Sequence, residues 1–102
     1  MTFRVTRMVR VKEGMGEQAH EHFQATKSLV EAHGNRLRAF EVELGGEHRA
    51  EVHFEFEYDS FEAYAAWRSG GGQSEEFRAI RAQMADLYDE GGSWYSSVSW
   101  DD

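Results

Sequence analysis

The sequence predicts an α+β fold, in which an antiparallel sheet of four strands is covered by helices on one face. Three observations predict this class. Apolar and polar residues alternate over four stretches of the chain, as they do in strands that bury one face. Other stretches repeat apolar residues at helical spacing. The order of these stretches is β-α-β-β-α-α-β, and the 102 residues suffice for one domain, 1–102.

The chain begins with a strand at 2–12 and a helix at 17–33. The strand alternates, and its apolar face carries a lone charge, Arg7. The helix repeats apolar side chains at helical spacing up to Gly34 and Asn35. Both of these residues tolerate left-handed backbone, so they predict the end of the helix.

Residues 36–44 and 49–58 predict the second and third strands, joined by a hairpin at Gly45-Gly46. Either Asp59 or Ser60 then caps a second helix by accepting backbone N–H groups.

The rest of the second half predicts helices and a last strand. SGGGQS at 69–74 predicts a flexible break, and 77–87 predicts one further helix. Residues 93–100 alternate and predict the fourth strand. This order of elements is that of a ferredoxin-like fold.

Each face of the predicted sheet has a distinct character. The apolar face, which the helices cover, comprises Phe3, Val5, Val9, Phe40, Val42, Val52, Phe54, Phe56, Trp94 and Val98. The charged face comprises Arg4, Arg10, Glu41, Glu43, Glu51, His53, Glu55, Glu57 and Tyr95. In a monomer the charged face meets water, whereas in a dimer two such faces meet.

Composition excludes several classes of function. The formal net charge is -8, and phosphate contacts need clustered Lys and Arg, so neither nucleic acid nor anionic membrane is expected as a partner. The chain has no cysteine, which excludes disulfides and thiolate ligands and fits a cytoplasmic protein. No apolar run approaches the roughly 20 residues of a membrane helix. His20 and His22 point to different sides of a helix, so no metal site is predicted.

Three short segments carry a resemblance to a known family. They are VKEG at 11–14, EYDSFEAYAAW at 57–67 and SEEFRAI at 74–80. They resemble a strand-ending turn, a strand followed by a capped aromatic helix, and the start of the next helix in the dimeric α/β-barrel superfamily. That superfamily includes antibiotic-biosynthesis monooxygenases, polyketide cyclases and NIPSNAP-type proteins. The resemblance implies a homodimer whose two sheets close an α/β barrel, with a pocket between each sheet and its helices.

The resemblance gives a role to two residues. Monooxygenase-like members place a polar residue on strand one, where Arg7 stands, and a Trp on the helix after strand three, where Trp67 stands. In the family both groups line the pocket. Heme-degrading members carry an axial His near this helical region, but SGGGQSEEF at 69–77 contains none. No cofactor is therefore predicted, although His22 or His33 would be the alternative ligand.

Arg7, His22 and Tyr64 are the predicted catalytic residues. A guanidinium on an apolar face is costly unless it is paired. Arg7 is therefore predicted to anchor an enolate, phenolate or carboxylate. The alternatives are a structural salt bridge and an irregular strand that turns Arg7 outward. His22 predicts a general base or a boundary histidine. Tyr64 predicts a proton donor or a packed core aromatic.

Aromatic residues on the helix and the apolar sheet face predict a surface for a flat substrate, with core packing as the alternative. The predicted substrate-binding residues are Trp67, Phe40, Phe54, Phe56 and Trp94.

Together with these residues, the resemblance implies a small, cofactor-independent enzyme of secondary metabolism that acts on an aromatic or polyketide-like molecule. The reaction would be a monooxygenase-like oxygenation, or a cyclisation or isomerisation through an enolate. The alternative is a non-catalytic homodimer of the NIPSNAP-like type that binds a small molecule or another protein, because no compact set of acid, base and nucleophile stands out.

Overall fold

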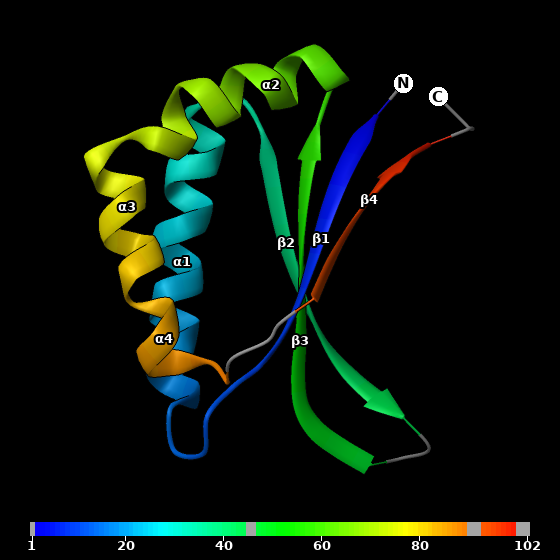
Figure 1. Ribbon diagram of the computed structural model, residues 1–102. Helices are drawn as coiled ribbons and strands as arrows, with labels where there is room; N and C mark the ends of the chain where they lie inside the picture. The colour runs from blue at the N-terminus through cyan, green and yellow to red at the C-terminus, as the bar shows by residue number, and fades with distance from the viewer. Residues whose placement is uncertain (1, 45–46, 90–92, 100–102) are drawn as a thin grey trace.

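The computed structural model describes residues 2–44, 47–89 and 93–99, without the side chains of 43–44, 47–50 and 93. The four strands form one antiparallel sheet in the order β2-β3-β1-β4, and the helices cover one of its faces (Figure 1). This is the predicted ferredoxin-like α+β fold. The elements are β1 (Phe3–Arg10), α1 (Gly16–Ala32), β2 (Arg36–Leu44), β3 (Glu47–Tyr58), α2 (Phe61–Ser69), the 3₁₀ turn η1 (Gly71–Gln73), α3 (Glu75–Ala82), α4 (Met84–Leu87) and β4 (Ser93–Val98).

The end of α1 is fixed by the two residues that the sequence predicted. Gly34 has a φ of 81°, which is left-handed backbone. Its N–H donates to the carbonyl oxygen of Glu31, and the N–H of Asn35 donates to that of Val30. These two bonds are a Schellman motif, which satisfies carbonyl groups that the helix leaves unpaired.

Serine side chains cap the N-termini of α2 and α3. Ser60 accepts a hydrogen bond from the N–H of Ala63 at the start of α2, and Ser74 accepts one from the N–H of Phe77 at the start of α3. The single helix predicted at 77–87 is instead two helices, α3 and α4, which part at Gln83.

The segment 69–74 was predicted as a flexible break, and this prediction was wrong. Gly71–Gln73 form the 3₁₀ turn η1, and Gly71 and Gly72 are buried against Trp67. A Cβ atom on Gly71 would lie 2.7 Å from Cζ3 of Trp67, which is closer than real contacts allow. The glycines are therefore needed because the turn packs tightly on the indole.

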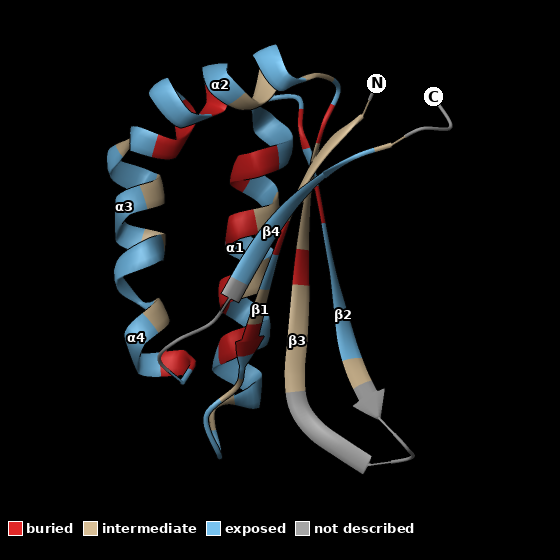
Figure 2. Ribbon diagram, turned by 45° about the vertical axis from the view of Figure 1, so that its right-hand side comes forward, coloured by how far each residue is buried: buried red, intermediate tan, exposed pale blue. Residues whose placement is uncertain are grey.

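The core lies between the sheet and α1. Figure 2 shows buried residues along α1 and on the strands behind it, whereas β4 is almost wholly exposed. Val30 and Leu37 are fully buried, and Val9 and Phe54 are nearly so. Burial of this apolar surface supplies most of the driving force for folding.

The prediction for the faces of β2 was wrong. Leu37 faces the helices and is fully buried, whereas Phe40 pairs with His53 on the opposite, open face of the sheet and is 47% exposed. Val42 lies with Phe40, and Glu41 lies on the helix-covered face. The strand carries apolar residues at both parities, so alternation alone does not decide which set is buried.

Some predictions fall outside the description. The hairpin at Gly45-Gly46, the end of the fourth strand at residue 100 and the side chain of Glu43 lie outside the described residues. Within the described part of the chain, no helix is long and apolar enough to cross a membrane.

Candidate ligand-binding site

A cavity of about 440 Å³ lies between the helix-covered face of the sheet and the helices. Val5, Phe54, Phe56 and Trp94 line it from the sheet. Phe23, Tyr64, Trp67 and Phe77 line it from the helices. A cavity of this size, with eight Phe, Tyr or Trp side chains in its walls, suits a flat organic ligand of two or three rings.

Arg7 is the charged group on the sheet side of this cavity. It lies in the middle of β1, with Phe54 and Trp94 as its neighbours across the two adjoining strands. Arg7 is exposed and Trp94 is 63% exposed, so the cavity opens where they lie. Among the described residues, none forms an ion pair or a hydrogen bond with the guanidinium of Arg7. All its side-chain donors are thus free to meet a ligand.

Two further arginines line the cavity from the helices. The guanidinium of Arg68 lies 5.8 Å from the ring centroid of Tyr64, and its Nη1 donates a 3.4 Å hydrogen bond to the Tyr64 hydroxyl. The guanidinium of Arg81 lies 5.4 Å from the ring centroid of Phe77. None of the described lining residues is Asp or Glu. The cavity is therefore cationic, although the chain as a whole has a net charge of -8.

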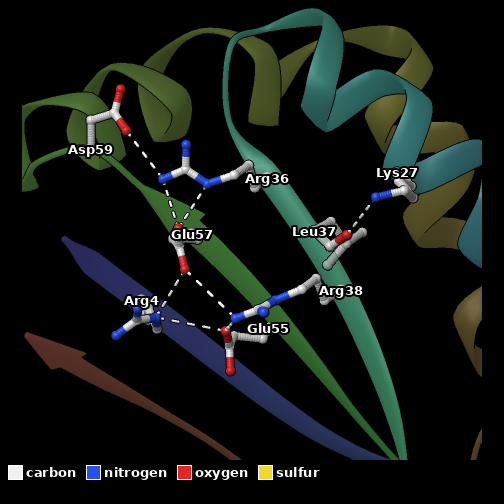
Figure 3. A network of polar contacts seen from close by, with 8 residues as sticks. All are labelled: Arg4, Lys27, Arg36, Leu37, Arg38, Glu55, Glu57 and Asp59. Carbon is white, nitrogen blue, oxygen red and sulfur yellow. Dashed lines mark hydrogen bonds and ion pairs between the residues drawn. The ribbon is translucent and has the colours of Figure 1, made fainter. Parts of the chain in front are cut away.

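On the open face of the sheet, by contrast, three arginines pair with carboxylates (Figure 3). Arg4 lies 3.0 Å from Glu57, Arg36 lies 2.7 Å from Glu57, and Arg38 contacts Glu55. These pairs cross three strands and neutralise one another. Arg4, Arg36 and Arg38 on this face have carboxylate partners, whereas the cavity arginines have none among the described residues.

The ion pairs determine how Glu57 titrates. Burial alone would raise the pKa of the Glu57 carboxyl, but hydrogen bonds from Arg4 and Arg36 outweigh burial, and the pKa lies below its usual value. Glu57 is therefore a structural anion at neutral pH.

His22 lines the cavity, but both of its ring nitrogens are engaged. Nε2 lies 2.8 Å from the carbonyl oxygen of Ile80, and Nδ1 lies 3.3 Å from the hydroxyl of Tyr88. A carbonyl only accepts, so Nε2 carries the proton and Nδ1 accepts from Tyr88. To act as a general base, His22 would first have to give up the bond to Tyr88.

Two tyrosines by the cavity differ in their access to a ligand. Tyr58 is 2% exposed. Burial, and to a smaller extent the nearby Tyr64, raises the pKa of its hydroxyl above the usual value. Tyr64 is half-buried, and its hydroxyl is held only by Arg68 among the described residues. Tyr64 is thus the better placed of the two to exchange a proton with a ligand.

The structure brings most of the predicted site residues together. Arg7, His22 and Tyr64 line the one cavity, together with Trp67, Phe54, Phe56 and Trp94. Phe40 is the exception, because it lies on the open face of the sheet. No group of three His, Asp or Glu side chains in the described part is placed to hold a metal ion.

Comparison with known proteins gives the fold its context. No family model matches the sequence, and no curated protein is similar to it in sequence. Solved structures do match: an uncharacterised NIPSNAP domain protein of Burkholderia xenovorans has a TM-score of 0.76 at 18% identity, over 97% of this chain and 95% of its own. This chain has the fold of the NIPSNAP-family structures.

Other structures share the NIPSNAP fold with this chain. Rv0793 of Mycobacterium tuberculosis has a TM-score of 0.76 at 13% identity, over 100% of this chain and 98% of its own. A Bacteroides thetaiotaomicron protein of unknown function, described as a possible oxidoreductase, has a TM-score of 0.72 at 17% identity, over 94% and 95%. Identity at this level shows the fold alone, which agrees with the resemblance drawn from the sequence.

Sequence reasoning missed Arg68 and Arg81 within this NIPSNAP-like fold. A signal for them exists, because each follows an aromatic residue by one helical turn: Tyr64 precedes Arg68, and Phe77 precedes Arg81, at the same spacing of four. Residues at this spacing lie on one helix face. When the aromatic residue lines a pocket, the arginine four positions later therefore lies at the same pocket.

Proposed function

We propose that the chain binds a flat organic anion of the aromatic or polyketide-like class in this cavity, and converts it through an enolate without a cofactor. Arg7 carries the proposal. Its guanidinium meets an aromatic cavity and has no partner among the described residues. A planar fork of donors suits an enolate, phenolate or carboxylate oxygen, and aromatic walls suit the ring system.

The arrangement supports chemistry that the substrate itself drives. Arg7 donates hydrogen bonds to the enolate oxygen, which lowers the free energy of the anion. In an oxygenation, the enolate carbon donates electrons to dioxygen and forms a carbon–oxygen bond, which yields a peroxide anion. The proton that the substrate loses on enolisation passes to solvent water. Tyr64 then protonates the peroxide, and water returns a proton to the Tyr64 oxygen. Loss of water leaves a carbonyl, so that CH2 and O2 become C=O and H2O.

The same enolate serves a cyclisation or an isomerisation, in which its carbon attacks a carbonyl or takes the proton at another position. Tyr64 is then the proton donor, and the walls formed by Trp67 and Phe54 hold the rings in place. Oxygen uptake separates this reaction from oxygenation.

A non-catalytic binding protein is the second candidate, and the geometry of His22 favours it. Both ring nitrogens of His22 are bonded, and none of the described lining residues is a carboxylate. The described part of the site therefore contains no free general base. A ligand that is already anionic needs none in order to bind.

We also propose that a second copy of the chain covers the open face of the sheet. Helices cover only the other face, while Phe40 and Tyr95 on the open face are 47% and 50% exposed. Arg4, Arg36 and Arg38 there are neutralised by Glu55 and Glu57, so these three arginines would not meet a second sheet as free charges. The resemblance to dimeric α/β barrels supports the same arrangement.

Oxygen uptake with anthrone, an aromatic ketone that enolises readily, tests the enzymatic proposal. We expect uptake by the wild type and a loss of roughly a hundredfold in Arg7→Gln, as for removal of one oxyanion donor. Arg10→Gln is the control, because Arg10 is an exposed arginine on the same strand but outside the cavity. Uptake that is unchanged in Arg7→Gln would overturn the role of Arg7. Binding of anthrone without uptake or other turnover would assign the binding function instead.

A further inference from the structure

Arg68 and Arg81 reach the ligand cavity from the wall opposite Arg7. We propose that they form a second anion-binding subsite, so that the ligand carries a carboxylate in addition to the anionic group at Arg7. This inference rests on the proposed function and deepens it, because it assigns the ligand to the class of aromatic dianions.

Each of the two guanidinium groups is held against an aromatic ring. Arg68 lies against the ring of Tyr64, and Arg81 lies against the ring of Phe77, at 5.8 and 5.4 Å from the ring centroids. Stacking on an aromatic face orients a guanidinium without neutralising its charge. Both groups are thus preorganised, and less side-chain entropy is lost when a ligand binds.

Neither guanidinium is neutralised by a carboxylate. Among the described residues, Arg68 and Arg81 form no ion pair, and none of the described lining residues is acidic. The chain contains 19 acidic and 11 basic residues, so a cavity lined by three arginines and no described carboxylate reverses the overall balance. Carboxylates are available to Arg4, Arg36 and Arg38 on the open face but not here.

The two residues also occupy similar positions on their helices. Each lies in the last turn, Arg68 in α2 and Arg81 in α3. The helix dipole stabilises a cation at this end without occupying its hydrogen-bond donors. Among the described residues, only the Nη1 of Arg68 has an acceptor, the Tyr64 hydroxyl, so the other donors stay available for the oxygens of a carboxylate.

Calorimetric titration with matched probes tests the subsite. We would use 2-naphthoate, which has one carboxylate, and naphthalene-2,3- and naphthalene-2,6-dicarboxylate, which have two at different spacings. We expect at least one dicarboxylate to bind the wild type about tenfold more tightly than 2-naphthoate, as one charge-assisted hydrogen bond provides. Arg68→Gln and Arg81→Gln should each weaken the dicarboxylate severalfold and leave 2-naphthoate unchanged.

Arg78→Gln is the matched control, because Arg78 is an exposed arginine on α3 that does not line the cavity. It should keep the preference for the dicarboxylate. Equal affinities of the wild type for all three probes would overturn the second subsite and leave the first intact. Equal weakening by Arg78→Gln would also overturn it, since only the overall charge would then matter. Failure of every probe to bind would overturn the proposed function itself. Circular dichroism verifies that each variant is folded.

Discussion

His22 joins α1 to the helices of the second half through two hydrogen bonds. Its Nε2 lies 2.8 Å from the carbonyl oxygen of Ile80 in α3, and its Nδ1 lies 3.3 Å from the hydroxyl of Tyr88, just after α4. The imidazole is 7% exposed, so both nitrogens depend on these partners. In this arrangement the main role of His22 is to position the helical wall of the cavity.

Replacement of His22 by Phe tests this positioning role. The hydroxyl of Tyr88 would lose its partner, whereas the carbonyl of Ile80 would keep the hydrogen bond from the N–H of Gln83. We expect the free energy of unfolding in urea to fall by about 1–3 kcal/mol, the cost of one buried polar group left unsatisfied. His20→Phe, at an exposed position of the same helix, should change it by less than about 0.5 kcal/mol. Equal stability of the two variants would contradict the positioning role.

Gly71 should tolerate no side chain. A Cβ atom there would lie 2.7 Å from Cζ3 of Trp67 and 2.8 Å from the His33 ring, so we expect Gly71→Ala to destabilise the fold by about 1–3 kcal/mol. Gly16 begins α1 and has nothing within 4 Å of its Cβ position, so Gly16→Ala should be neutral or stabilising by up to about 1 kcal/mol. Urea unfolding of both variants is the measurement. A stable Gly71→Ala variant would show that the turn does not pack on the indole as described.

The chain should lose stability in alkali because of its buried tyrosines. Burial raises the pKa of Tyr88 to about 12 and also raises the pKa of Tyr58, whereas a tyrosine in the unfolded chain ionises near pH 10. The unfolded state therefore holds fewer protons above about pH 10, and the free energy of unfolding falls as pH rises.

This stability is fully present below about pH 10 and is lost as the pH rises through the folded-state pKa values. Each tyrosine contributes a slope of up to about 1.4 kcal/mol per pH unit. Tyr88→Phe should flatten the slope between about pH 10 and 12, whatever it does to stability at pH 7. Tyr95→Phe, at a half-exposed tyrosine, is the control. The same slope in wild type and Tyr88→Phe would contradict the burial of that hydroxyl.

A charge at Phe40 should separate the proposed dimer. The exposed ring would lie between the two facing sheets, so Phe40→Glu would bury an unpaired carboxylate in each copy. Size-exclusion chromatography with light scattering should show a dimer for the wild type and a monomer for this variant. Phe61→Glu, at an exposed ring on α2, should remain dimeric. A wild-type monomer, or a dimeric Phe40→Glu variant, would contradict the interface.

The element order followed from the sequence because each signal was local. Alternation marked the strands, and the pair Gly34 and Asn35 marked the end of α1 through its own backbone preference. The faces of β2 did not follow, because its apolar residues occur at both parities. The deciding factor is tertiary: Arg36 and Arg38 meet Glu57 and Glu55 across the strands only if Phe40 lies on the open face.

The candidate site was only partly predictable, because local signals mark some of its residues and not others. Arg7 stood out as a charge on an apolar strand face, and the structure places it in the cavity. Arg68 and Arg81 share helix faces with Tyr64 and Phe77, but this spacing alone does not say that those faces line a cavity. Their importance depends on where α2 and α3 lie against the sheet, which long-range packing determines. The hydrogen bond between His22 and Tyr88 likewise joins residues 66 positions apart.

The most direct test of the account is the affinity of Arg7→Gln for an aromatic anion. Calorimetry would compare the dissociation constants of wild type and variant for 2-naphthoate, with uncharged 2-methylnaphthalene as the matched probe. The account predicts that 2-naphthoate binds the variant at least about tenfold more weakly, because a charge-assisted hydrogen bond is lost. It predicts no change for 2-methylnaphthalene. Equal affinity of the two proteins for 2-naphthoate would contradict the claim that Arg7 anchors the ligand.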